Sequence, residues 1–237
     1  MKKFLLIAVV LLATSCETAQ QVLNSLPNQT GGLTTQQIAA GLKEALTVGT
    51  QNGTNQLSAV NGFFANAAVK ILMPEEAKKV ESTLRGIGLG NVVDKAVLSM
   101  NRAAEDAAKS ATPIFVNAIK QMTITDAIGI LKGGNNAATN YFKEKTTAQL
   151  TNAFQPVINK ALEKVDATKY WSDVFTAYNK FAATPVNTDL SAYVTGKAID
   201  GIFYEVAQEE QKIRKDPAAR VTDLLKKVFG SDIAQGS

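Results

Sequence analysis

Hydrophobic residues recur along most of the chain at steps of three and four, the spacing that places side chains on one face of an α-helix. The clearest stretch covers residues 91–111, with apolar positions at Val93, Val97, Met100, Ala104, Ala107 and Ala111. Because its second half is alanine, another helix can approach closely there. We find no sustained alternation of β-branched residues between hairpin turns, so strands are not expected. The pattern predicts an all-α fold, a single multi-helix, bundle-like domain.

Prolines, glycines and capping residues predict where the helices begin and end. Thr34 or Thr35 is expected to cap a first helix, and Gly49 lies just past its expected end. Pro74, Pro113 and Pro217 are each expected to open a helix in its first turn. Helices are predicted over residues 35–46, 57–73, 74–86, 91–111, 136–149, 156–165, 169–182 and 189–214.

The N-terminus has the architecture of a secretory signal peptide. Lys2 and Lys3 precede a nine-residue apolar run, and small residues at 13–15 lead into Cys16. Nine residues rise only about 14 Å as a helix, against a hydrocarbon core of about 30 Å, so a lasting membrane span is not expected. The segment resembles the lipobox of bacterial lipoproteins, although Ala13 stands where that motif usually has Leu. The alternative is an ordinary secreted protein with an incidental cysteine.

Four regions follow from this interpretation. They are a signal peptide at 1–15, an acylated Cys16 with a Gln-, Asn- and Ser-rich tether to residue 32, a helical domain at 33–230 and a disordered tail at 231–237. Removal of fifteen residues from the 237 would leave 222, enough for one substantial core.

Composition excludes several classes of function. The chain has no histidine and Cys16 is its only cysteine, which excludes imidazole catalysis, disulfides, thiolate zinc sites and a cysteine nucleophile in the domain. No cofactor or metal is expected. The formal charge of +4 includes Lys2 and Lys3 of the removable segment. The remaining charges are mixed in sign, so nucleic-acid binding is not expected.

Asn101, Arg102 and Glu105 are candidate ligand-binding residues on the clearest helix. They form either an ordinary surface ion pair or one wall of a polar cleft. Glu209 falls on the apolar line of the last long helix and is expected to be partly buried, with Arg214, Arg102 or Arg85 as its partner. That glutamate is either half of a structural ion pair or part of a site.

Two further positions complete the candidate ligand-binding set. Asp126 stands three residues after Thr123, the spacing of a helix-capping box, and capping is a sufficient explanation for it. Arg85 precedes the glycine-rich stretch 86–90, where an anion could meet the amides that open the next helix. The alternative is that these glycines simply end a helix.

Six motifs occur in an order and spacing that resemble the bacterial envelope family catalogued as domain of unknown function 4197. They are GLKEAL (41–46), GFF (62–64), MNRAAE (100–105), MTITDA (122–127), AATNYF (137–142) and IRKDP (213–217). The resemblance covers residues 33–230 and implies a helical, exported, often lipid-anchored domain with no established activity. Gly62 stands where the family pattern has an acidic residue.

The sequence favours a binding or envelope-structural module over an enzyme. We expect it to be held to a membrane by acylated Cys16, on the periplasmic side of the outer membrane, and to bind an envelope protein or a small apolar or anionic ligand near Asn101, Arg102, Glu105 and Glu209. One alternative is a hydrolase of envelope glycans that uses Glu105 and Glu209. Another is a carrier of lipids within a helical lining of aromatic residues.

Overall fold

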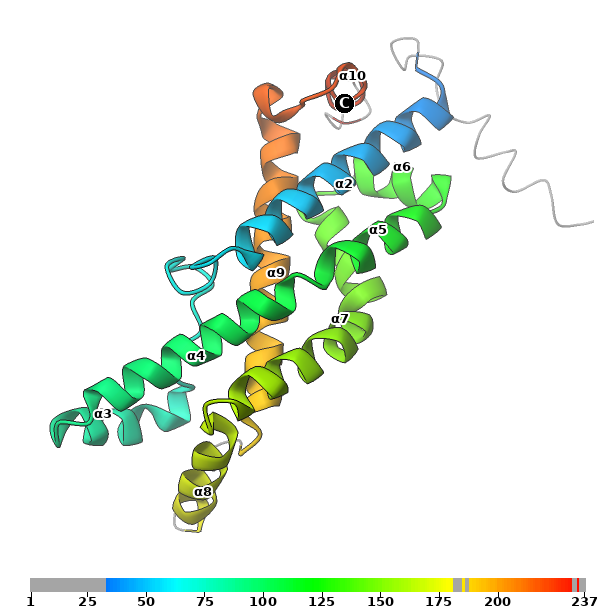
Figure 1. Cartoon of the computed structure of the whole chain (residues 1–237). Coiled ribbons are helices and arrows are strands. Elements are labelled where there is room, and N and C mark those ends of the chain that lie inside the picture. The colour runs from blue at the N-terminus through cyan, green and yellow to red at the C-terminus, as the bar shows by residue number, and fades with distance from the viewer. Residues whose placement is uncertain (1–32, 181–184, 186–187, 232–233, 235–237) are drawn as a thin grey trace, which may run out of the picture.

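A computed structural model describes residues 33–180, 185, 188–231 and 234, and within these ranges the chain forms helices and no strand (Figure 1). The predicted all-α fold is confirmed. The α-helices are α2 (Thr35–Ser58), α3 (Lys78–Gly86), α4 (Gly90–Ala108), α5 (Ala111–Gln121), α6 (Ile124–Lys132), α7 (Ala137–Glu163), α8 (Ala167–Asn179), α9 (Leu190–Lys215) and α10 (Asp223–Phe229). Short 3-10 turns, η1 (Glu75–Ala77) and η2 (Pro217–Ala219), precede α3 and follow α9.

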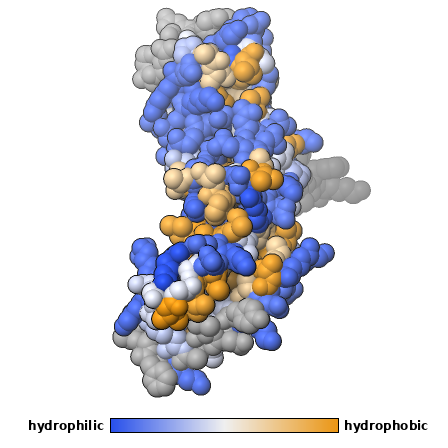
Figure 2. All heavy atoms as spheres, turned by 60° about the vertical axis from the view of Figure 1, so that its left-hand side comes forward, coloured by the Kyte–Doolittle hydropathy of each residue, from blue (hydrophilic) through white to orange (hydrophobic). Residues whose placement is uncertain are grey.

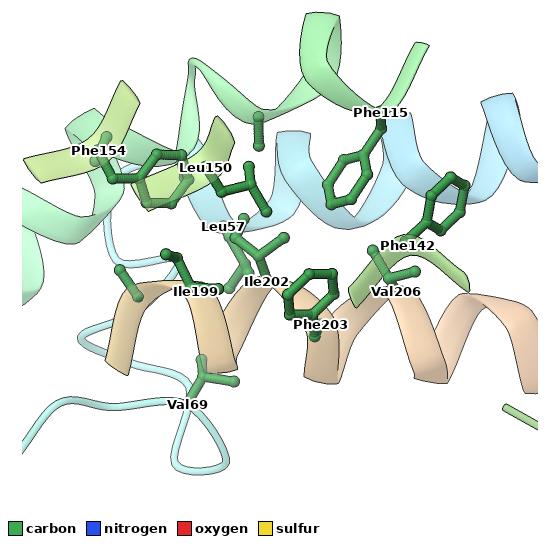
Figure 3. Close-up of a cluster of buried hydrophobic side chains, with 14 of the residues drawn as sticks. Leu57, Val69, Phe115, Phe142, Leu150, Phe154, Ile199, Ile202, Phe203 and Val206 are labelled. Atoms are coloured by element: carbon green, nitrogen blue, oxygen red, sulfur yellow. The ribbon is translucent and has the colours of Figure 1, made fainter. Parts of the chain in front are cut away.

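Helix α9 is the centre of the fold, because α2, α4 and α7 all pack against it. The core between these helices is apolar and aromatic (Figure 3). The ring of Phe115 contacts Phe142 and Phe203 edge-to-face, with centroids 5.1 and 6.2 Å apart. Such pairs stabilise a core beyond the area that they bury.

The alanine-rich stripe of α4 lies inside this core as predicted. Val93, Val97 and Met100 are buried, and the alanines that follow are almost fully inaccessible. The helix ends at Ala108, earlier than predicted, and α5 begins at Ala111 with Pro113 in its first turn.

Helix α2 is twice as long as predicted, because it continues through Gly49 to Ser58. A Cβ atom added at Gly49 would lie 3.5 Å from Cβ of Glu209, and one at Gly53 would lie 3.4 Å from Cβ of Glu205. Glycine therefore marks the close crossing of α2 and α9 and not a helix end, and burial against α9 outweighs its low helix propensity.

The predicted helix over 57–73 is wrong, because residues 59–74 form a folded segment of turns. Asn61 has a φ of 70°, and a Cβ at Gly62 would stand 2.5 Å from the carbonyl oxygen of Leu57. The Asn61-Gly62 pair is thus a tight turn that no other residue type at position 62 fits. Phe63, Val69 and Ile71 nevertheless reach the core, and we call residues 59–74 the buried loop after these three side chains, whereas Val60 and Leu72 of the same segment are exposed.

Helix α7 is continuous across Pro156, where the sequence predicted a break. Pro156 is exposed, whereas Leu150, Phe154, Ile158 and Leu162 are fully buried along the opposite side. The apolar contacts of this face offset the hydrogen bond that proline removes. Helices α8 and α9 agree with their predicted ranges to within a few residues, except that the predicted residues 181 and 182 lie outside the described part. The helix expected to open at Pro217 is only the short 3-10 turn η2, and α10 begins later, at Asp223.

Among the described residues, no single helix is long and apolar enough to cross a membrane. Two consecutive stretches, Gly90–Gln121 and Ile124–Lys132, meet the length and composition criterion together, across a bend of 106°.

Candidate functional site

Asn101 lies at the interface between α4 and the buried loop, and its side chain is completely inaccessible. Its Oδ1 accepts a hydrogen bond from the amide of Ile71 (2.8 Å), and its Nδ2 donates to the carbonyl oxygens of Ile71 and Val97 (both 2.7 Å). Both N–H donors of the side-chain amide, and its oxygen, are thus bound to backbone groups. Asn101 therefore holds the buried loop in place and does not line an open cleft.

Glu105 performs the same task one turn later on α4. The side chain is 5% exposed, and its Oε1 accepts from the amides of Phe63 and Phe64 (both 3.2 Å). Its Oε2 pairs with Arg102, whose Nη2 donates to Asn61 (2.8 Å). The predicted ion pair of Arg102 and Glu105 is confirmed, but both carboxylate oxygens already bind the protein itself.

The sequence analysis missed a third anchor of the buried loop, Glu205 of α9. This carboxylate is buried and accepts from Nδ2 of Asn66 (2.8 Å). It lies beside Gly53, at the crossing of α2 and α9. The sequence signal for it was its place on α9, one turn before Glu209. A glutamate at a position where a glycine lets two helices cross closely becomes buried between them.

Glu209 is partly buried, as expected, with 14% of its side chain exposed, but the expected partner is wrong. It binds Lys212 (3.3 Å) and Nδ2 of Asn52 (3.1 Å), not Arg214, Arg102 or Arg85. The buried carboxylate is its neighbour Glu210, which pairs with Arg214 (2.9 Å).

The pair of Glu210 and Arg214 joins the ends of two helices. Glu210 accepts from the amides of Ala138 (3.0 Å) and Thr139 (2.9 Å) in the first turn of α7, where Asn136 supplies no side-chain cap. Arg214 donates to the carbonyl oxygen of Ile130 (2.7 Å) in the last turn of α6. Both charges thus complement the helix dipoles at the turn between α6 and α7.

Asp126 forms the predicted capping box with Thr123 at the start of α6. Hydrogen bonds from the hydroxyl and then the amide of Thr123 hold the pKa of the Asp126 carboxyl below its usual value. Arg85 pairs with Asp94 and with Glu81 (both 2.9 Å), and these bonds raise the pKa of its guanidinium. Since two carboxylates already occupy Arg85, the structure gives no support for an anion site there.

The candidate residues therefore do not converge. Glu105 contacts the buried loop, whereas Glu209 contacts α2 at Asn52, and they share no partner among the described residues. No contact in the structure pairs these two carboxylates as a two-carboxylate hydrolase would require. The described part of the chain also contains no group of three acidic, histidine or cysteine side chains placed to hold a metal ion.

Three cavities of about 500 Å³ or more lie among the described residues, and the most apolar of them is a groove between α3, α4 and α8, with a volume of about 500 Å³. Ligand pockets commonly occupy about 300–1,000 Å³ and have mostly apolar walls. Trp171 and Phe175 of α8 line one side, with ring centroids 4.3 Å apart. Among the described lining residues only Glu81 and Lys95 are charged. The other described lining residues are Met73, Ala77, Val80, Leu84, Val92, Ala96, Leu98, Ser99, Met100, Val165, Ala167 and Leu190.

This groove opens on a face of the molecule where hydrophobic side chains gather. Figure 2 shows them over the lower half of the view, the part of the molecule that contains α3, the start of α4 and α8 in Figure 1. Val92 and Val165, on opposite walls, are 56% and 53% exposed, and Leu98 is 36% exposed. Contiguous apolar surface of this kind on a folded domain indicates a binding site.

The sequence contained a partial signal for the groove. Exposed apolar residues such as Val92 and Leu98 lie on α4 outside the buried stripe, and the predicted helix over 169–182 contains Trp171 and Phe175. Only the position of α8 relative to α3 and α4 brings these residues together.

Comparison with known proteins extends this description. Cys16 lies outside the described residues, so the structure says nothing about its modification. No curated protein and no solved structure matches the chain. One family model does match, over residues 32–230, which is most of the chain and coincides with the helical domain. The chain therefore belongs to the family described as "Protein of unknown function (DUF4197)".

Proposed function

We propose that this protein is a membrane-anchored envelope lipoprotein whose helical domain binds a long apolar ligand, such as an acyl chain, in the groove between α3, α4 and α8. The anchor in this proposal is acylated Cys16, and the domain faces the periplasm from the outer membrane. The observation that carries the binding function is the groove itself, which has apolar walls on both sides and two adjacent aromatic rings.

The shape and chemistry of the groove favour an acyl chain over a polar ligand. Its walls offer few hydrogen-bond donors or acceptors, so a sugar or a nucleotide would lose its bonds to water without replacement. An aliphatic chain loses none, and it gains from every CH₂ group that leaves water. The alternative of a lipid carrier, raised by the sequence, is thus better supported than a polar site at Asn101 and Glu105.

Trp171 provides a direct test, because it is the only tryptophan of the chain and it lines the groove. Fatty acids brominated along the acyl chain should quench its fluorescence saturably, and unbrominated chains of the same length should compete. Quenching requires contact between the bromine atoms and the indole, so it reports occupancy of this site.

Ala96 offers a variant that fills the groove without touching the core. Ala96→Phe should reduce the affinity for the brominated chain by about tenfold or more, since it displaces part of a buried apolar ligand. The matched control is Ala207→Phe, since Ala207 is also half-buried on a long helix but does not line the groove. Equal quenching in both variants, or no saturable quenching in the unmodified protein, would contradict the proposed ligand.

Attachment is tested separately by the mass of the protein purified from membranes. Acylation of Cys16 should appear as the mass of a chain that begins at residue 16 plus its lipid. A chain that retains residues 1–15, or one with a free thiol at Cys16, would contradict the anchor.

A further inference from the structure

The turn between α3 and α4 is an uncharged apolar tip. Residues 86–93, with the sequence GIGLGNVV, contain no charged side chain. Ile87 is 67% exposed, Leu89 43% and Val92 56%. Figure 1 shows this turn at one extremity of the molecule, at the end of α4 that lies far from α10. We call residues 86–93 the apolar tip.

Charges begin again at the base of the apolar tip. Arg85 and Asp94, the residues on either side of it, form an ion pair of 2.9 Å that closes the turn. Above this pair, the amides of Ile87, Gly88 and Leu89 donate to carbonyl oxygens in the last turns of α3, at 3.2, 3.2 and 2.9 Å. Gly88 has a φ of +88°, which glycine adopts without strain and which allows this tight reversal.

These properties are those that a segment needs to enter a lipid bilayer. The amides of Ile87, Gly88 and Leu89 already have partners and lose little on leaving water, whereas those of Gly90 and Asn91, at the uncapped start of α4, need the polar headgroup region as their surroundings. The ion pair lies where the polar headgroups would be. The side chains of Ile87 and Leu89 are exposed to water. Their transfer into the apolar interior of a membrane would be favourable.

We infer that the apolar tip inserts into the boundary between the headgroups and the acyl chains of a membrane. A protein partner fits the tip less well, because a stable protein interface needs about 800 Å² from each side and three aliphatic side chains supply only a small part of that area. A bilayer requires no such minimum, since each apolar side chain partitions on its own.

The position of the tip also connects it with the groove, and this step rests on the proposed function. Val92 belongs to both features, so an acyl chain that leaves the membrane at the tip meets an apolar wall of the groove at this residue.

Fluorescence of a label on the tip tests this insertion in the full-length protein reconstituted into vesicles of phosphatidylethanolamine and phosphatidylglycerol. Leu89→Cys would carry an environment-sensitive NBD group, and the matched control is Val60→Cys, because Val60 is an aliphatic residue in another turn and is 78% exposed. The wild-type chain, taken through the same labelling, gives the background from Cys16.

Insertion predicts a blue shift of the emission at position 89, together with quenching by lipids that carry a doxyl group on the acyl chain. Neither change is expected at position 60. Adding Ile87→Ser to the labelled Leu89→Cys chain should weaken the quenching, because it removes apolar side-chain area from the tip.

Two results would overturn the inference. One is emission at position 89 that matches a water-exposed label, and the other is a blue shift without doxyl quenching, which would indicate contact with protein, such as a second copy of this chain. Acylation of Cys16 is determined from the mass, and groove occupancy from Trp171. Failure of the tip is therefore distinguishable from failure of the proposed function.

Discussion

Replacement of Glu210 by alanine should destabilise the protein far more than the same replacement at Glu209, although the two residues are neighbours on α9. Glu210→Ala removes the acceptor of two amides at the start of α7, those of Ala138 and Thr139, and both residues are buried. A buried donor without a partner costs about 1–3 kcal/mol. It also leaves Arg214, with 11% of its side chain exposed, without its carboxylate.

The magnitudes separate the two variants clearly. Breaking a buried ion pair by removing one partner costs about 3–5 kcal/mol, and the unsatisfied amides are part of the same loss, so we expect Glu210→Ala to lower the free energy of unfolding by about 3–5 kcal/mol. Glu209 pairs with Lys212, whose side chain is 56% exposed. An exposed pair contributes about 1 kcal/mol or less, so Glu209→Ala should cost no more than that.

Urea denaturation followed by far-ultraviolet circular dichroism measures both values under identical conditions. With a slope of about 2 kcal/mol per molar urea, the midpoint of Glu210→Ala should fall by about 2 M. Helix propensity does not confound the comparison, because both changes are Glu to Ala within one helix. Equal losses in the two variants would refute the assignment of Glu210 as the cap of α7.

Two further changes test the polar contacts. Asn101→Ala should lower the free energy of unfolding by about 2–4 kcal/mol, because Ile71 keeps a buried amide and carbonyl without their partner. The same change should speed tryptic cleavage after Lys70, whereas exposed Asn91→Ala should alter neither. Asp126→Asn should lower stability at neutral pH, because the folded-state pKa of Asp126 lies below its ordinary value of 3.8 and the ionised carboxyl therefore stabilises the fold above that pH. This difference between variant and wild type should shrink as the pH falls below about 3.8, and a constant difference in urea titrations across that range would contradict it.

The sequence predicted those parts of the fold that depend on local pattern. Hydrophobic spacing identified the buried face of α4, and the capping box at Thr123 and Asp126 was found where it was expected. These features depend on residues within one or two turns of each other, so the sequence contains all the information needed.

The errors arose where long-range packing decides the structure. Gly49 resembles a helix end by its propensity, yet it lies inside α2 because α9 crosses there. The helical spacing of residues 57–73 was misleading for the opposite reason, since Asn61-Gly62 forms a turn and Asn101 and Glu105 supply the hydrogen bonds that the loop's own backbone lacks. The Asn-Gly pair was the local signal that should have taken precedence.

The position of a buried acid on α9 shows the same limit. The apolar positions 202, 206 and 213 define a face of α9 that passes close to both Glu209 and Glu210. Hydrophobic spacing alone therefore does not decide which of the two glutamates is buried. The choice is made by the start of α7, where the amides of Ala138 and Thr139 need an acceptor. That requirement exists only once α6, α7 and α9 are packed together.

The functional candidates were misplaced for a reason that follows from the chemistry of buried polar groups. Asn101 and Glu105 stand out in the sequence because each is polar beside an apolar face, as Glu210 proves to be in the structure, and a polar group in that position must find partners within the protein. In this fold the partners are backbone amides and carbonyls, so these residues stabilise an irregular loop and a helix junction. The apolar surface that remains exposed to water, which is unfavourable for the protein on its own, lies elsewhere. It comprises Ile87, Leu89 and Val92 and the groove beside them. Since burial of apolar area is the largest favourable term in binding, a ligand or a membrane that covers this surface would stabilise the folded state by mass action. A search for function in this family should therefore begin with the apolar features that its helices leave uncovered, and not with its polar signatures.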